Sequence, residues 1–455
     1  MTSHAQFAVG PVVWVVFASA AVAQPASPSA APAPPSAQRG ENRENEFHTP
    51  FPVPASNTPD EFRSQYLSGN WMGARSALGD QGIQFNLLFI ADPFGNVTGG
   101  RRRGASDYNL LGFGVTLRTD QLLGWQGGQF HVGFAENFGT SLSKEYIGNS
   151  FPVQLADVAD AHPRLTYLSY TQSLLKDKLS IRVGRVTINS VGGEEFLASK
   201  YFKAFVSVGV DLVPIGIFLN APGAFGYPDT TWGARIRLAP AKRFYTMVGA
   251  YNGDPALKQG QQHGVDFSLR GPPFLIAEIG FLGDSTNLKF GGYYNGGAAD
   301  IFASRPDRPA ETSRDRYGVY VLGDRTLLRF GDSGQDRHLG VFGAFVAAPD
   351  QRVNEVPYFF DSGLVMYGPS RSRPKDFVGF AAVYGSYSSD LRRAEEAQPT
   401  SAGIQYFEMT LEWNYGWAIR PGLLLEPDVQ YIIHPNGNKL LPNALAMGLN
   451  IVVNL

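Results

Sequence analysis

The chain has 455 residues, no cysteine and a formal net charge of -2. The lack of cysteine excludes disulfides, thiol catalysis and cysteine-bound metal, and the near-neutral charge without a basic block argues against nucleic-acid binding. Charged residues make up only 17% of the chain, fewer than in most soluble domains, yet the mean hydropathy of -0.14 is too polar for a bundle of membrane helices. A membrane β-barrel fits both values, because only every second residue of its strands has to be apolar.

The first residues have the pattern of an export signal. Residues 7–18 form a short apolar core, and an A-V-A tripeptide ending at Ala23 matches a cleavage site, although no Lys or Arg precedes the core. This pattern predicts a cleaved signal peptide over residues 1–23. Residues 24–59 are rich in Ala, Pro and Ser and cannot bury enough apolar surface to fold, which predicts a flexible linker before a folded domain over residues 60–455.

A short helix is the first predicted element of that domain. Asn70 can cap a helix N-terminus, and Trp71, Ala74 and Leu78 fall on one helical side. The sequence therefore predicts a helix over residues 70–78, just before the first strand.

The rest of the domain alternates between apolar and polar residues. In residues 407–415 large apolar side chains occupy every second position, with Glu408 and Glu412 among the residues between them. A period of two is that of a strand with two different faces. Clear alternation occurs at residues 111–118, 130–135, 179–184, 232–238, 275–281, 407–415 and 445–455, and weaker candidates lie at 83–91, 164–171, 202–210, 244–251, 287–294, 317–322, 339–346, 358–366, 376–385 and 424–433.

These segments predict an all-β fold, a transmembrane antiparallel β-barrel of about 16 strands, give or take about two. A strand of roughly 10 residues tilted by ~40° covers about 25 Å, the height of the apolar band of an outer-membrane barrel. The alternation at 445–455 continues to Leu455, as expected for a strand that closes a barrel against the first one. The alternative is a secreted soluble β-rich binding protein or enzyme, whose polar faces would meet solvent.

Three stretches of the domain carry family-like motifs. The first covers residues 69–104 and includes Trp71, Gly73 and Arg75; the second is WGAR at 232–235 with YNGDP at 251–255; the third covers residues 427–455. In this order they resemble the carbohydrate-selective porins of the OprB family over essentially everything after the linker. The resemblance implies a barrel of about 16 strands in the Gram-negative outer membrane that passes sugars by facilitated diffusion. Leu455 departs from it, because an aromatic residue is usual there.

The polar strand faces supply candidate pore-lining residues. Arg182, Arg235 and Arg237 alternate with lipid-type residues, so a barrel would turn them toward water, where a planar guanidinium can hydrogen-bond to adjacent sugar hydroxyls. The other wall candidates are Glu278, Glu408 and Glu412, which can line the lumen or pair with these arginines.

Two further candidates, Arg102 and Arg103, belong to the arginine triplet at residues 101–103. A cationic cluster turned into the lumen and a solvated hairpin tip both remain open for this triplet.

The sequence shows no catalytic or metal-binding motif. HExxH, GxSxG, GxGxxG and phosphate-loop patterns are missing, and the seven histidines have no metal spacing. The adjacent Glu194 and Glu195 fit a surface loop better than a catalytic site, and Glu408 and Glu412 lie roughly 13 Å apart along a strand, too far for a glycosidase. The sequence therefore predicts neither an enzyme nor a bound cofactor or metal.

The predicted function is facilitated diffusion of monosaccharides or small oligosaccharides through a polar lumen lined with Arg and Glu. Sugar solutes and outer-membrane lipid are the predicted partners, with nucleic acid excluded and a homo-oligomer left open. A general or carboxylate-preferring diffusion porin remains an alternative, because the indication of sugar rests mostly on the resemblance.

Overall fold

The computed structural model describes residues 65–157, 159–189, 195–211, 214–258, 265–302, 311–330, 337–398 and 403–455. The predicted signal peptide at 1–23, the linker at 24–59 and the domain boundary at residue 60 lie outside the described residues.

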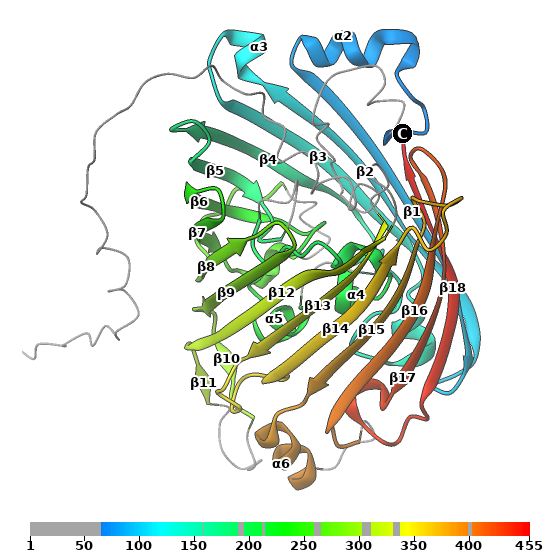
Figure 1. The fold of residues 1–455 in the computed structure, drawn as a ribbon. Helices are drawn as coiled ribbons and strands as arrows, with labels where there is room; N and C mark the ends of the chain where they lie inside the picture. Colours follow the sequence, from blue (N-terminus) through cyan, green and yellow to red (C-terminus); the bar gives the residue numbers. More distant parts are fainter. Residues whose placement is uncertain are drawn as a thin grey trace, which may run out of the picture. The chain divides into compact units, whose positions relative to one another are not determined.

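Sixteen strands of the described residues close into an antiparallel barrel, as predicted (Figure 1). The strands of the barrel are β1 (Ile83–Thr98), β2 (Gly104–Arg118), β3 (Gly128–Gly139), β4 (Pro163–Leu174), β5 (Leu179–Val186), β6 (Thr231–Ala241), β7 (Phe244–Asn252), β8 (Pro273–Leu282), β9 (Thr286–Asn295), β12 (Arg316–Phe330), β13 (Arg337–Ala347), β14 (Tyr358–Tyr367), β15 (Phe377–Ser386), β16 (Phe407–Arg420), β17 (Leu423–Ile433) and β18 (Ala444–Asn454). Two further short strands, β10 (Ala299–Asp300) and β11 (Thr312–Ser313), pair only with each other, so β9 pairs with β12. β18 pairs with β1, which confirms the predicted closure.

Short helices occupy some of the connections between strands. They are η2 (Trp71–Gly73), α2 (Ala74–Asp80), α3 (Thr119–Leu123), η3 (Ser143–Ile147), η4 (Phe202–Ala204), α4 (Val208–Asp211), α5 (Gly216–Asn220), η5 (Pro255–Lys258), α6 (Ser389–Ala397) and η7 (Pro435–Gly437). In the described part of the chain, no helix has the length and apolar character needed to cross a membrane. The helix predicted at 70–78 is present as η2 and α2. Asn70 is the N-cap residue of η2 without a side-chain bond to that turn, and its Oδ1 accepts a hydrogen bond from the backbone N–H of Ser76, in the first turn of α2, at 2.9 Å.

The two ends of the barrel differ in the length of their connections. At one end the turns are short, such as 421–422 between β16 and β17; at the other, the connections from β3 to β4 and from β5 to β6 are long. Outer-membrane barrels place short turns in the periplasm and long loops outside. The end that carries α2 and the end of β18 corresponds to the periplasmic end of such barrels (Figure 1).

The two faces of the wall have the predicted chemistry. On β6, Ile236 is 45% exposed while its neighbour Arg235 is 1% exposed, and on β16 the same relation holds between Trp413 and Glu412. Because successive strand residues point to opposite faces, the apolar side chains face outward and the charged ones face the interior.

One predicted strand is wrong. Residues 202–210 form no strand but the turn η4 and the helix α4, inside the barrel. The backbone N–H groups of Val206 and Ser207 bond to the Glu412 carboxylate at 2.6 and 3.2 Å instead of to a neighbouring strand. The segment is apolar because it is surrounded on several sides within the barrel, and such a run resembles a buried strand in sequence.

Arg75 of α2 stabilises the end of the chain where the last strand, β18, pairs with the first strand, β1. Its Nη2 donates to the backbone oxygen of Leu455 at 2.8 Å, and its guanidinium lies 3.8 Å from the ring centre of Tyr66 and 4.2 Å from that of Trp71. The backbone N–H of Leu67 donates to the Asn454 oxygen nearby. Trp71 and Arg75, the residues of the first family-like motif, thus have a structural role in barrel closure.

Candidate functional site

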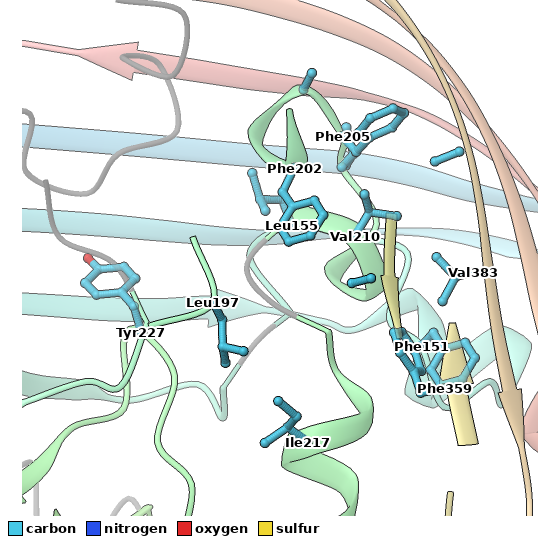
Figure 2. Packing of buried hydrophobic residues seen from close by; sticks show 14 of the residues in the cluster. Phe151, Leu155, Leu197, Phe202, Phe205, Val210, Ile217, Tyr227, Phe359 and Val383 are labelled. Atoms are coloured by element: carbon cyan, nitrogen blue, oxygen red, sulfur yellow. The ribbon is translucent and has the colours of Figure 1, made fainter. Parts of the chain in front are cut away.

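Two long loops fold back into the barrel and narrow its interior. α4 and α5, both in the β5–β6 connection, lie inside the wall (Figure 1), and Figure 2 shows loop side chains packed against the inner faces of β14 and β15. Phe151 of the β3–β4 loop meets Phe359 of β14 edge-on at 5.6 Å between ring centres. Phe205 meets Phe342 of β13 at 5.4 Å. The path for a solute is therefore bounded by loops as well as by the wall.

Carboxylates of the wall hold these loops through their backbone N–H groups. Glu408 of β16 accepts hydrogen bonds from Ser150, Phe151 and Asn436 at 2.8, 2.9 and 2.5 Å. Glu412, four residues farther along the same face of β16, accepts those of Val206 and Ser207 described above. Both side chains are buried, so in this structure the two carboxylates contact loop backbone rather than water.

Other strands use the same device. Glu278 of β8 accepts from the Leu197 backbone at 3.0 Å and from the hydroxyls of Tyr245 and Tyr320. Asp324 of β12 accepts from the Lys200 backbone at 3.2 Å. A carboxylate that accepts several N–H bonds positions a loop without a partner strand, because it satisfies donors that would otherwise be buried and unpaired.

Arg182, Glu195 and Arg235 form a cationic triad that the sequence did not predict, in which Glu195 and Arg235 are buried and Arg182 is half-buried. Arg182 of β5 and Arg235 of β6 lie directly opposite each other in the strand register. The carboxylate of Glu195, from the β5–β6 loop, accepts from both: from Arg182 Nη1, and from Arg235 Nη2 at 3.2 Å. Opposed like charges destabilise a strand pair, so Glu195 offsets their repulsion and fixes the loop end.

Two further cations lie close to the triad. Arg237 is half-buried, and its guanidinium lies 4.7 Å from the ring centre of Tyr245. The ammonium of Lys289, on β9, donates to the Ala198 oxygen of the same loop. The interior wall from β5 to β9 and the loop bound to it therefore carry four cations, Arg182, Arg235, Arg237 and Lys289, against the two buried glutamates Glu195 and Glu278.

Inward polar side chains that keep some exposure lie toward the periplasmic ends of their strands. Gln129, Ser173, Arg237 and Asn287 are all half-buried and all face the interior near a short turn. Arg182 is half-buried farther along β5. These side chains are the described wall groups best placed to meet a hydrated solute.

Arg102 and Arg103 lie in the turn between β1 and β2, at the end with the long loops. Both are exposed, and Arg102 pairs with Glu145 of the β3–β4 loop at 3.2 Å. Their contact with a passing solute stays a prediction. The same holds for Arg182, Arg235 and Arg237 and for the three buried glutamates Glu278, Glu408 and Glu412.

Some of this arrangement could have been found in the sequence and some could not. Lys289 alternates with Leu288 and Phe290 in a predicted strand, so the period places it on the inner face. Glu195 carries no such signal, because it lies in a loop whose inward course has no period; Glu194 is outside the described residues. Among the residues described, no group of three or more His, Asp or Glu side chains is placed to hold a metal ion.

A buried carboxyl in the β3–β4 loop predicts a pH effect. Burial raises the pKa of Asp157 to about 6, against the opposing effects of the Ser141 hydroxyl and the Lys144 ammonium. Because the folded pKa exceeds the unfolded one, the stability that Asp157 contributes is full at low pH and is lost as the pH rises through about 6.

We therefore expect the β3–β4 loop to loosen as the pH rises from about 4 to about 6, between the ordinary pKa of an aspartate and the raised pKa of Asp157. The protection factors of the backbone amides at 141–157, which compare each exchange rate with the intrinsic rate at the same pH, should fall over this range. Asp157→Asn keeps a hydrogen-bond acceptor for Ser141 and should remove the pH dependence; an unchanged profile in this variant would contradict the assignment.

Comparisons with known proteins agree with the architecture. Residues 102–455 match the family model described as carbohydrate-selective porin, OprB family. The chain is 25% identical to Porin B of Pseudomonas aeruginosa over 427 residues, covering 85% of this chain and 91% of that protein. The high-pH structure of Pseudomonas putida OprB superposes with a TM-score of 0.80 at 23% identity, covering 86% of this chain and 99% of that one. The low-pH structure of the same protein gives a TM-score of 0.55 at 19% identity.

Proposed function

The chain belongs to the OprB family of carbohydrate-selective porins of the outer membrane, and from that premise we propose that monosaccharides or small oligosaccharides pass along the inner wall of β5 to β9. Arg182 and Arg237 bind these sugars transiently as they diffuse through the channel. Fold and family both describe a transport channel.

One observation carries this proposal: Arg237 is half-buried beside the Tyr245 ring on the inner face of the wall. The guanidinium offers paired donors to adjacent sugar hydroxyls, and the buried Tyr245 ring beneath it holds it in position. Such hydrogen bonds are weak for a hydrated solute, which lets it leave as readily as it enters.

The positive charge of this wall also supports a second candidate function, a pore that prefers carboxylates. Arg182, Arg235, Arg237 and Lys289 outnumber the two buried glutamates of this region, Glu195 and Glu278, and such an excess of positive charge would also attract carboxylates. Liposome swelling with glucose and with gluconate, which share a carbon skeleton and differ in charge, separates the two candidates. Faster entry of glucose supports the sugar porin, equal rates indicate a general pore, and faster entry of gluconate indicates a carboxylate-preferring one.

Arg237→Ala is expected to weaken sugar binding in the channel. Loss of charge-assisted hydrogen bonds of about 1.5–3 kcal/mol should lower the apparent affinity by roughly 10-fold or more, measured as the block of ion current by glucose in a planar bilayer. The cation preference should rise at the same time. Arg237→Lys serves as the control, because it keeps the charge and loses the planar fork; it should restore ion selectivity but not the sugar block.

A further inference from the structure

An extended segment, residues 265–270, lies across the outer face of three neighbouring strands. Its backbone oxygens accept side-chain hydrogen bonds from β5, β6 and β7 in turn. The Asp266 oxygen accepts from Arg185 at 3.3 Å and from Trp232 Nε1 at 2.7 Å, and the Ser268 oxygen accepts from Asn252 at 2.9 Å. We call residues 265–270 the outer strap.

The strand period places these three donors on the outside of the barrel. Trp232 has the same parity on β6 as the exposed Ile236, and Arg185 follows the exposed Val183 by two residues on β5. Arg185 and Trp232 are direct partners in the register. The strap therefore covers the extracellular ends of β5 to β7 from the side that faces the membrane.

The strap presents apolar side chains away from the wall. Val265, Phe267 and Leu269 alternate along it and are 57%, 63% and 73% exposed. The Phe267 ring packs on Trp232 at 5.2 Å between ring centres, which fixes the strap to the wall. Below the strap, the apolar outer surface continues directly into Ile236 on β6.

Two of the three strands beneath the strap, β5 and β7, are shorter than the other strands of the barrel wall. β5 has 8 residues and β7 has 9, whereas β1 has 16 and β2 has 15. A strand of 8 residues at a tilt of ~40° spans only about 20 Å, short of the apolar band of about 25 Å. The strap also covers Arg185, which is 1% exposed on an outward position where a charge in hydrocarbon is unfavourable.

We propose that the outer strap completes the lipid-facing belt over β5 to β7, with Phe267 and Leu269 in contact with the acyl chains of the outer leaflet. The strap adds apolar height where the wall is short and shields Arg185 from hydrocarbon. The strap is continuous with the outer face of β6, which faces lipid in a membrane barrel, and its own three side chains offer only about 500 Å², less than the ~800 Å² per partner of a typical stable interface. Lipid is therefore the occupant rather than a second copy of the chain.

The lack of native cysteine allows a direct test with single-cysteine variants. Phe267→Cys and Leu269→Cys are labelled with the fluorophore NBD in the full-length protein reconstituted into phosphatidylcholine vesicles. Ile279→Cys, on the exposed outer face of β8, is the hydrocarbon control, and Glu396→Cys, exposed on α6, is the water control. Heat-modifiability on gels verifies that each labelled variant has a closed barrel.

The strap labels should show blue-shifted emission and strong quenching by a lipid with a nitroxide near its headgroup. Quenching by iodide should be weak, as for Ile279→Cys, although Ile279→Cys should respond more to a nitroxide deep in the chain. Emission and iodide quenching like those of Glu396→Cys at both positions would overturn the proposal, because the strap would then lie in water. Protection from both quenchers together with cysteine cross-linked dimers would equally overturn it in favour of a second copy.

Discussion

Replacing Glu408 and Glu412 together by alanine is expected to release both inward loops and to widen the channel. The two carboxylates accept four backbone N–H bonds from these loops, from Ser150, Phe151, Val206 and Ser207, and a fifth from Asn436 in the β17–β18 connection. Each buried donor left unsatisfied costs about 1–3 kcal/mol, so the loops should leave their positions rather than remain packed with unpaired groups. We expect a larger and noisier single-channel conductance and entry of sugars that the unmodified channel excludes.

The strand itself supplies a matched control for this experiment. Thr410 lies between the two glutamates on the same inner face and is fully buried, and its hydroxyl has no hydrogen-bond partner among the described residues. Thr410→Val keeps the shape of the side chain and should leave conductance unchanged. A double alanine variant with the conductance and size limit of Thr410→Val would show that the apolar packing alone holds the loops.

Glu195→Ala is expected to have the second large effect, because it leaves Arg182 and Arg235 opposed and buried without their shared carboxylate. Removing one member of a buried ionic group costs about 3–5 kcal/mol. The folded barrel should convert to its heat-denatured form at a lower temperature, measured by gel mobility. The reversal potential in a salt gradient should shift toward anion preference, since one negative charge is lost from the interior.

A second substitution separates electrostatics from loop packing. In Glu195→Ala combined with Arg235→Ala, one of the two opposed arginines is also gone, so much of the lost thermal stability should return. If the double variant is less stable than Glu195→Ala alone, repulsion between the arginines is not the cause, and the role of Glu195 is confined to holding the loop.

The fold was largely predictable because the two sides of a barrel wall meet different environments, and each residue of a strand has to suit the side that it faces. Lipid on one side and a polar interior on the other impose a period of two, which is why Ile236 and Arg235 could be assigned to opposite faces. The strand predicted at residues 202–210 was wrong, because loop residues packed inside the barrel meet apolar neighbours on several sides. Such a segment is apolar throughout and has no period that distinguishes a strand from a loop or helix.

The candidate site was predictable only in part, since alternation gives the face of a residue and not what covers it. Glu408 and Glu412 were assigned to the inner face, and the structure places them there beneath loop backbone. Glu195 was missed because the inward course of its loop depends on contacts far apart in the sequence, with Arg182 on one strand and Arg235 on another. Such pairings follow from tertiary structure, which a single sequence does not display.

The hydrogen bond from Arg75 to Leu455, which we call the Arg75 clamp, lies where β1 and β18 close the barrel. It affects the rates at which the barrel closes and opens. These two strands are separated by nearly the whole described chain, so their pairing has the largest loop to close and is expected to come last during insertion. The hydrogen bond from Arg75 to Leu455 forms only after that step. Contacts made after the rate-limiting step slow the reverse reaction while leaving the forward rate almost unchanged. The clamp therefore lengthens the lifetime of the closed barrel in the membrane without delaying its assembly.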